Sequence, residues 1–299
     1  MDDIIYCCVM TDHSEYKDAS PELLSALGYE FSSWKDEETK EIRHTLYFPC
    51  EKDALDAMNT LRAKRAEFAS FGVCFDDIAC TILKKEDWAE SWKIHFKPLV
   101  ISDTLAISPT WEHFEPKAGQ TLILLDPGMS FGTGQHATTK SCLASIDRFV
   151  AELHEQGKQE ITMLDAGSGS GILAIAACKL GCTRVDAFDI DPDTIAIARE
   201  NAQKNGIADD DLSIRAASLA EYESDMQYDI VAANILSSAL IAGKEKLLSF
   251  CKSGTLLILA GILDAEYEKV RREFESTGRC RELFSVGEKE WRGGTFRVC

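Results

Sequence analysis

The sequence predicts an α/β chain, in which a mostly parallel sheet covered by helices on both faces follows a small α+β unit. The first observation is that apolar, strand-like runs alternate with helical stretches from Thr121 onward. Such alternation is typical of a parallel sheet with helices on both faces. The second is the order β-α-β-β-α-β within residues 1–85, which is that of a ferredoxin-like fold.

The elements of the first unit follow from apolar spacing and from residues that start helices. A strand is expected at 4–10, and Ser20 followed by Pro21 is typical of a helix start. A hairpin is expected from strands 31–34 and 42–48, then a helix over 53–71 and a strand at 78–83. This fold does not by itself indicate a function.

Residues 86–118 are expected to connect this unit to a second domain, 119–299. The connector contains three tryptophans and three prolines (Trp88, Trp92, Trp111, Pro98, Pro109 and Pro116), so we expect it to be packed. In the second domain we expect strands at 161–164, 185–188, 230–233 and 256–260, and helices at 172–180, 192–205, 238–250 and 265–276. A closing pair of strands is expected at 281–286 and 295–298.

Composition limits the function classes. No apolar run reaches the ~20 residues that cross a bilayer, and the N-terminus carries acids where a secretory signal carries bases, so we expect a cytoplasmic protein. Eleven cysteines form no C-x-x-C pair and six histidines show no ligand spacing, so no metal site is expected. The net charge of −18 argues against nucleic-acid binding and suits a basic protein partner, although it also fits a merely solubilising surface.

The strongest local motif is a glycine-rich stretch that follows strand 161–164 and opens the next helix. It reads Asp165-Ala-Gly167-Ser-Gly169-Ser-Gly171. Glycines allow a sharp turn and close approach of a ligand, and ligands of open α/β sheets bind at the carboxyl ends of strands. The G-x-G-x-G spacing differs from the G-x-G-x-x-G of dinucleotide sites. It therefore favours S-adenosylmethionine, with Asp165 near the cationic end of that molecule.

A second acidic position completes this prediction. Asp189 ends the next strand, 22 residues after Gly167, where a carboxylate can accept hydrogen bonds from both ribose hydroxyls. Asp191 precedes Pro192 and is expected to cap the following helix. The alternative is that both acids only end a strand and cap a helix.

Several segments together resemble the ribosomal protein L11 methyltransferases, the PrmA family. They are Trp88-Ala-Glu-Ser-Trp92 with Phe96-Lys-Pro98, Ile107-Ser-Pro109-Thr-Trp111, the loop from Asp126 to Thr139, the stretch from Asp165 to Ala177, Ala232-Ala-Asn234-Ile-Leu236, and Gly261-Ile-Leu263. The resemblance covers residues 86–265 well, and the N-terminal unit matches in pattern and position. It implies a class I methyltransferase, Rossmann-like fold for the second domain.

The resemblance also implies site residues and a substrate. Contacts to S-adenosylmethionine would come from Thr139, Gly167, Asp189 and Asn234, joined by Phe131 and Gly132 of the preceding loop and by Asp165, Gly169 and Gly171. The acceptor would be amino groups of a ribosomal protein, with the N-terminal unit recognising it. Two departures are Ala137, where the family usually has proline, and the long polar stretch 149–160, which we interpret as a surface insertion.

Two residues are candidates for the chemistry of transfer. Asn234 could orient an amine, because Ala-Asn-Ile-Leu differs from the Asn-Pro-Pro-Tyr motif used on planar nitrogens and thus favours an aliphatic amine. A buried structural amide is the alternative. His136 could accept the proton of the amine or hold its loop, and we favour the second role. The loop 131–139 is hypothesised to fold over the cofactor.

Three other functions remain open on sequence alone. The chain could methylate lysines of another protein, such as an electron-transfer flavoprotein subunit, because the N-terminal unit sets the target. It could be a non-catalytic nucleotide-binding adaptor, although the cofactor residues are intact. A hydride-transferring dehydrogenase would need the missing G-x-G-x-x-G. Which amines are modified, and the oligomeric state, do not follow from the sequence.

Overall fold

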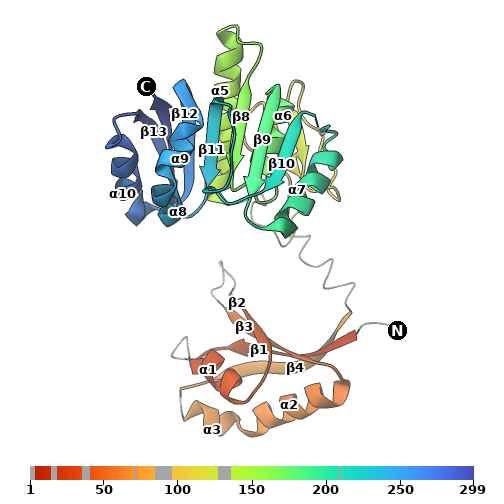
Figure 1. Cartoon of the computed structure of the whole chain (residues 1–299). Coiled ribbons are helices and arrows are strands. Elements are labelled where there is room, and N and C mark those ends of the chain that lie inside the picture. The colour runs from red at the N-terminus through yellow and green to blue at the C-terminus, as the bar shows by residue number, and fades with distance from the viewer. Residues whose placement is uncertain are drawn as a thin grey trace. The chain divides into compact units, whose positions relative to one another are not determined.

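The fold is that of a computed structural model, which describes residues 4–14, 19–35, 41–70, 72–84, 96–126, 136–208 and 210–299. The chain divides into two compact units, 1–95 and 96–299, each of which is described by itself (Figure 1). The described part of the expected connector, 96–118, belongs to the second unit. No helix within the described ranges is long and apolar enough to cross a membrane.

The first unit has the expected β-α-β-β-α-β order. Its elements are β1 (Ile4–Asp12), α1 (Ala19–Ala26), β2 (Phe31–Lys35), β3 (Ile42–Phe48), α2 (Glu51–Ala63), α3 (Arg65–Ala69) and β4 (Phe75–Lys84). The four strands pair antiparallel in the order β2-β3-β1-β4. Ser20 lies inside α1 instead of capping it, and its hydroxyl bonds Ser14 Oγ at 2.7 Å. The helix expected over 53–71 is interrupted at Lys64.

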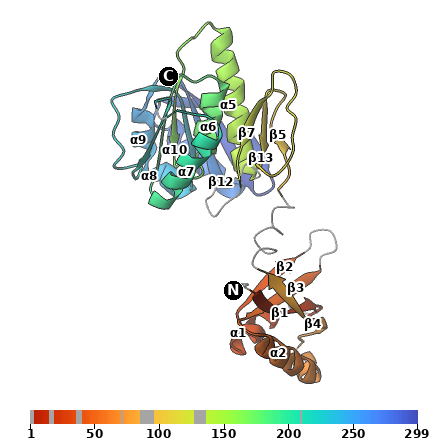
Figure 2. The same cartoon turned by 90° about the vertical axis from the view of Figure 1, so that its right-hand side faces the viewer.

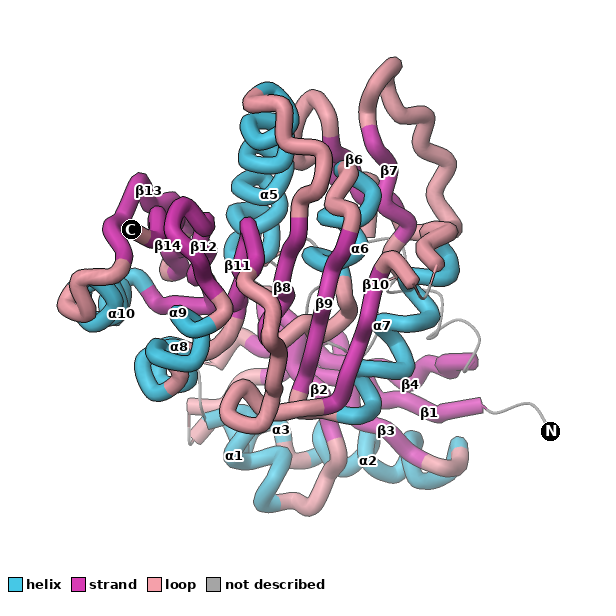
Figure 3. The backbone as a smooth tube through the Cα atoms, turned by 45° about the horizontal axis from the view of Figure 1, so that its top comes forward, coloured by secondary structure: helices cyan, strands magenta, loops and turns pink. Residues whose placement is uncertain are grey.

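A seven-stranded sheet forms the centre of the second unit. Its strands are β8 (Thr162–Ala166), β9 (Arg184–Asp189), β10 (Leu212–Ala216), β11 (Tyr228–Asn234), β12 (Cys251–Leu263), β13 (Cys280–Glu288) and β14 (Trp291–Val298). They lie in the order β10-β9-β8-β11-β12-β14-β13, which Figure 3 shows in magenta. The pairs from β10 to β12 are parallel, whereas β14 runs antiparallel to β12 and β13. The reversal of strand order beside β8 makes the carboxyl ends of β8 and β11 the place where a ligand is expected.

Two helix layers cover this sheet. The first consists of α5 (Ala137–Glu155), α6 (Ile172–Leu180) and α7 (Pro192–Lys204), and the second of α8 (Ser237–Ala242), α9 (Lys244–Ser249) and α10 (Asp264–Glu275). Consecutive strand residues alternate between two buried clusters: Met163 packs with the first layer and Leu164 with the second. Figure 2 gives a second view of these elements. The α/β fold predicted from alternating strands and helices is therefore confirmed.

Some local expectations were wrong. Residues 149–155 are not a surface insertion but the last turns of α5, and Phe149 and Val150 are buried in the core. The polar residues of this stretch lie on the solvent side of an amphipathic helix, which hid its apolar face. The helix expected over 238–250 is divided at Gly243 into α8 and α9.

A three-stranded sheet was not expected. It contains β5 (Leu99–Val100), β6 (Leu105–Ser108) and β7 (Thr121–Leu124), in that order. At its β7 edge the side-chain amide of Asn205 takes the place of a neighbouring strand, because it accepts from Leu124 N at 2.9 Å and donates to Leu124 O at 2.7 Å. These strands are too short to produce a clear alternating pattern in the sequence.

Candidate functional site

The glycine-rich stretch forms a tight loop between β8 and α6. The backbone N–H groups of Gly167 and Ser168 both donate to Phe188 O, at 2.9 and 3.0 Å, which ties the loop to the end of β9. Gly167 has a φ of 79°, and a Cβ there would lie 2.4 Å from Ile235 Cγ2. Gly171 also has a positive φ and precedes the first residue of α6. A side chain at position 167 would therefore collide with its neighbour as well as strain the backbone.

Asp189 is oriented at the end of β9 by two backbone groups. Gly169 N donates to its Oδ2 at 2.8 Å and Asp191 N donates to its Oδ1 at 3.1 Å. Each carboxylate oxygen keeps accepting capacity, and the residue is partly exposed. Asp191 accepts from Asp193 N at 2.9 Å, with Pro192 at the first helical position, as expected for a cap. Asp189 is thus held in place and free to bind hydroxyl groups.

Asp165 is the most deeply buried acid of the site. Its side chain is 0% exposed, and its Oδ2 accepts from Ala174 N at 3.1 Å. Burial raises the pKa of Asp165 to about 7; the Ala174 N–H opposes this change and the Asp189 carboxylate adds to it. Near neutral pH this group therefore exchanges between a neutral and an ionised form, and a nearby cation would favour the ionised form.

Asn234 ends β11, the strand beside β8. Ala233 pairs with Ala166 in the register of these strands, so Asn234 lies next to the start of the glycine loop. Its Nδ2 donates to Thr139 Oγ1 at 3.4 Å, and Thr139 is buried in the first turn of α5. Nδ2 thus faces Thr139, and Oδ1 has no hydrogen-bond partner among the described residues. The structure therefore brings together Thr139, Asn234 and the glycine loop.

Buried oxygen atoms without a hydrogen-bond partner collect at this edge of the sheet. Within the described residues they are Asp165 Oδ1, Ser168 Oγ and Asn234 Oδ1. An unsatisfied buried polar group costs about 1–3 kcal/mol, so a ligand that donates hydrogen bonds here would remove a real penalty. The ammonium group of S-adenosylmethionine carries three N–H donors, and the positively charged sulfur lies three carbon atoms further along the same chain. The residues present fit this cofactor, with Asp165 and Ser168 toward its cationic end and Asn234 beside them at the end of β11.

An apolar pocket of about 270 Å³ lies beside Asp189. Its walls include Gly167, Phe188, Ile190, Ile235 and Leu236. Ile190 is 73% exposed and Leu236 70% exposed, which is unusual for large aliphatic side chains. A planar, weakly polar ring such as adenine would cover both, and Asp189 at the rim would accept hydrogen bonds from the ribose. The pocket therefore fits the nucleoside half of the same cofactor.

His136 lies just before the first turn of α5. Its Nδ1 is 2.7 Å from Thr138 Oγ1, and its ring packs edge-to-face on the Trp291 ring, with centroids 4.9 Å apart. These contacts tie His136 to the start of α5, and its predicted role of holding the loop stays a prediction. Of the hypothesised loop 131–139, Phe131 and Gly132 lie outside the described residues, so their predicted contacts stay predictions.

A family model for ribosomal protein L11 methyltransferase (PrmA) matches residues 13–293. The chain belongs to this family. The PrmA family consists of S-adenosylmethionine-dependent methyltransferases, so the resemblance, the class I fold and the cofactor predicted from the sequence are confirmed.

Individual relatives agree with this membership. The chain is 34% identical to the ribosomal protein L11 methyltransferase of Caldanaerobacter subterraneus over 85% of this chain and 79% of that protein. It is 43% identical to that of Trichlorobacter lovleyi over 71% of this chain and 68% of that protein. A crystal structure of the ribosomal protein L11 methylase of Lactobacillus delbrueckii is 32% identical, with a TM-score of 0.60, and covers 68% of this chain and 99% of that one.

Sequence reasoning missed two residues of this PrmA-family site. Ser168 lies between two glycines of the motif, where a hydroxyl gave no separate signal, yet its Oγ is buried and has no hydrogen-bond partner in the described part of the chain. Trp291 is more than 150 positions from His136 in the sequence, and no local pattern joins them. Only the antiparallel return of β14 brings Trp291 to the edge of the sheet where α5 begins.

Proposed function

We propose that this protein transfers methyl groups to amino groups of ribosomal protein L11: lysine side chains and, as a second kind of acceptor, the amino-terminal amine. The observation that carries the proposal is the buried Asn234 Oδ1, which has no hydrogen-bond partner among the described residues, while Nδ2 donates to Thr139 Oγ1. An acceptor-only oxygen at this point can take an N–H of an incoming amine and direct the nitrogen lone pair elsewhere. The names of the relatives support the choice of acceptor.

The side chains of the site have to orient a neutral amine. Deprotonating a lysine of pKa ~10.4 at pH 7 costs about 4.6 kcal/mol, and carboxylates beside it would increase that cost. Asp165 is completely buried beneath the loop and Asp189 is engaged by the loop backbone, which leaves the neutral amide of Asn234 to meet the amine. The bound cofactor supplies a methyl group on a positively charged sulfur. Holding the amine in line with that group can supply much of the rate enhancement.

We also propose that the first unit recognises the acceptor protein and that the reaction takes place in the cytoplasm, where ribosomal proteins are made. Trp34 of β2 is 54% exposed and lies opposite Arg43 of β3. Tryptophan and arginine are enriched at protein interfaces. The large negative charge of the chain suits a basic ribosomal protein.

The test is mass spectrometry of acceptors incubated with the enzyme and isotopically labelled methyl donor. Purified ribosomal protein L11, whole ribosomes and ribosome-free soluble protein are compared. Label on lysines of L11 supports the proposal. Label that appears only in the ribosome-free fraction, for example on an electron-transfer flavoprotein subunit, would reject it. Trp34→Ala is expected to raise KM for the protein acceptor several-fold, while Leu55→Ala on the exposed side of α2 serves as the matched control.

A further inference from the structure

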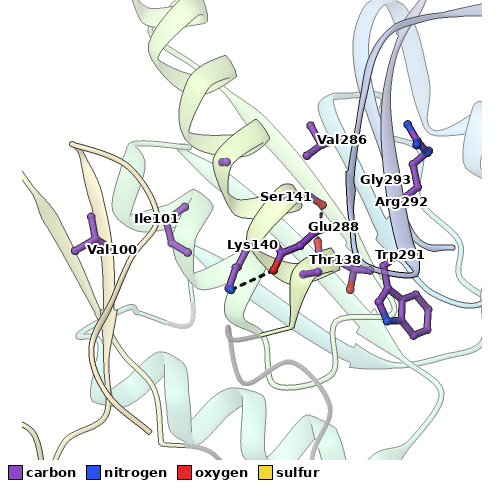
Figure 4. Close-up of a pocket in the computed structure, with 12 residues that line it drawn as sticks. Val100, Ile101, Thr138, Lys140, Ser141, Val286, Glu288, Trp291, Arg292 and Gly293 are labelled. Carbon is purple, nitrogen blue, oxygen red and sulfur yellow. Dashed lines mark hydrogen bonds and ion pairs between the residues drawn. The ribbon is translucent and has the colours of Figure 1, made fainter. Parts of the chain in front are cut away.

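A second pocket, of about 210 Å³, lies on the α5 side of the large sheet. It is walled by the first turns of α5, by Val100 and Ile101 of the small sheet region, and by the β13–β14 hairpin. Figure 4 shows Val100 and Ile101 on one side, Val286 and Trp291 on the other, and Lys140 with Glu288 between them. Its volume is below the ~300–1,000 Å³ usual for whole small-molecule ligands, so it suits part of a polypeptide.

The pocket is linked to the methyl-transfer point through one turn of helix. Thr138 lines the pocket, and the next residue, Thr139, hydrogen-bonds Asn234. On the sheet side, Asn234 pairs with Ala260 of β12, and a Cβ at Gly293 of β14 would lie 3.3 Å from Ala260 Cβ. Gly293 is therefore two strand spacings, roughly 10 Å, from Asn234.

The surface of this pocket is apolar and its charges are paired. Val100 and Val286 are 51% and 48% exposed. Lys140 Nζ lies 3.8 Å from Glu288 Oε1, and Arg292 Nε donates to Asp264 Oδ1 at 2.6 Å. With the charges neutralised in pairs, the groups left to contact a ligand are mainly aliphatic and aromatic, together with the hydroxyls of Thr138 and Ser141, so the pocket favours an apolar side chain over an isolated ion.

The net charge of the protein favours a basic partner. Around the pocket itself the acids Glu288, Glu290 and Asp264 are balanced by Lys140, Lys289 and Arg292. The chain as a whole carries 50 acidic and 32 basic residues. A cationic polypeptide is therefore attracted to the molecule as a whole, and an apolar side chain on it can enter this pocket.

We propose that this pocket binds an aliphatic side chain of the acceptor protein next to the target lysine, and so selects which lysine is methylated. The inference rests on the proposed amino-group methylation. An extended chain advances about 3.4 Å per residue, so a pocket roughly 10 Å from Asn234 reads a residue within about three positions of the target. Specificity would then come from a short sequence as well as from recognition by the first unit.

The test fills the pocket without touching the site. Ala144→Phe places a ring in the pocket from the exposed side of α5, and Ala151→Phe adds the same ring to the same helix outside it. With whichever protein the wild type is found to methylate, Ala144→Phe is expected to raise KM for that acceptor about tenfold or more, the order of effect expected from burying one aliphatic side chain. Ala151→Phe should leave this KM unchanged. Neither variant should change the affinity for S-adenosylmethionine, which calorimetry measures.

Two further measurements keep the proposal open to refutation. Val286→Ser alters an exposed side chain and should raise the same KM without affecting folding. Acceptor peptides in which the aliphatic residues flanking the lysine are replaced by serine should lose affinity for the wild type but not for Ala144→Phe, because the two changes remove one contact. Equal KM in all variants, or a loss of kcat with unchanged KM, would overturn the pocket assignment. A wild type that methylates no amine at all would instead refute the proposed function.

Discussion

Each end of the large sheet holds a buried carboxylate, and the two differ in how many hydrogen bonds and ion pairs they receive. At the amino ends of β8 and β11, Asp229 accepts from Lys158 Nζ at 2.6 Å, from Thr162 N at 3.0 Å and from Thr162 Oγ1, and Lys252 Nζ lies 2.7 Å away. At the carboxyl ends of the same two strands, the described residues give Asp165 one hydrogen-bond partner, Ala174 N, and give its Oδ1 none.

The pKa values follow this difference. Burial alone would raise the pKa of Asp229, but its hydrogen bonds from Lys158, Lys252 and Thr162 outweigh burial and lower it. Burial raises the pKa of Asp165 to about 7 because nothing of comparable strength opposes it. A carboxylate whose oxygens are fully hydrogen-bonded holds strands together. A carboxylate with an oxygen left without a partner can still bind a ligand.

The largest effect is expected at the carboxyl ends of β8 and β11, from Asn234→Ala. Without the amide the amine loses its orienting contact, and kcat should fall roughly 10²-fold. Steady-state kinetics with the protein acceptor measures this change. Asn234→Asp keeps the size but adds a charge that raises the pKa of the amine, so its pH–rate profile should move to higher pH. An Asn234→Ala variant with wild-type kcat would reduce Asn234 to a structural amide.

Asp165→Asn should separate binding from stability. It removes the charge that faces the cationic end of the cofactor, so affinity for S-adenosylmethionine should fall roughly 10- to 100-fold. It also removes a buried group that is ionised above pH 7, so Tm of the cofactor-free protein at pH 8 should be no lower than that of the wild type. Calorimetry and thermal unfolding give the two values. A large loss of Tm with unchanged affinity would make Asp165 a structural acid like Asp229.

Asp229→Ala should give the reverse result. Two lysines lose their partner, and the unit should lose about 2–3 kcal/mol, less than the ~3–5 of a fully buried pair because both lysines reach solvent. The corresponding fall in Tm is roughly 5–10 °C. Affinity of the folded protein for S-adenosylmethionine should be unchanged. Because the folded pKa of Asp229 is lowered, its contribution is present above pH ~4 and is lost as pH falls further.

The smallest effect is a pH dependence of cofactor binding. The pKa of Asp165 is raised in the folded protein, so the cofactor-free protein loses folding stability as pH rises from ~4 toward 7. A bound cation beside the ionised carboxylate restores that stability. Affinity for S-adenosylmethionine should therefore increase about tenfold between pH 6 and 8, as the ionised fraction of a group with pKa near 7 increases. Calorimetry at several pH values should show this slope in the wild type and a flat profile in Asp165→Asn.

Much of this arrangement follows from local sequence. Asp191 followed by Pro192 predicts its helix start, and the glycine spacing with Asp189 predicts the cofactor, because both depend on neighbouring residues. The helical nature of residues 149–155 was missed because their solvent face is polar. The sequence could not predict that oxygens of Asp165, Ser168 and Asn234 are buried without a hydrogen-bond partner among the described residues. Their surroundings depend on strands that pair from more than 60 positions apart. The contact of His136 with Trp291 depends on another long-range pairing, that of β14 with β12.

Asn205 has a consequence for self-association. The outer strand of a small sheet offers unpaired N–H and C=O groups, to which a strand of another molecule can add, and such edges are common starting points of aggregation. At Leu124 both groups are already occupied by one side-chain amide. A single asparagine at the end of α7 thus closes this edge against strand addition at that position, and the protection lasts as long as α7 remains folded.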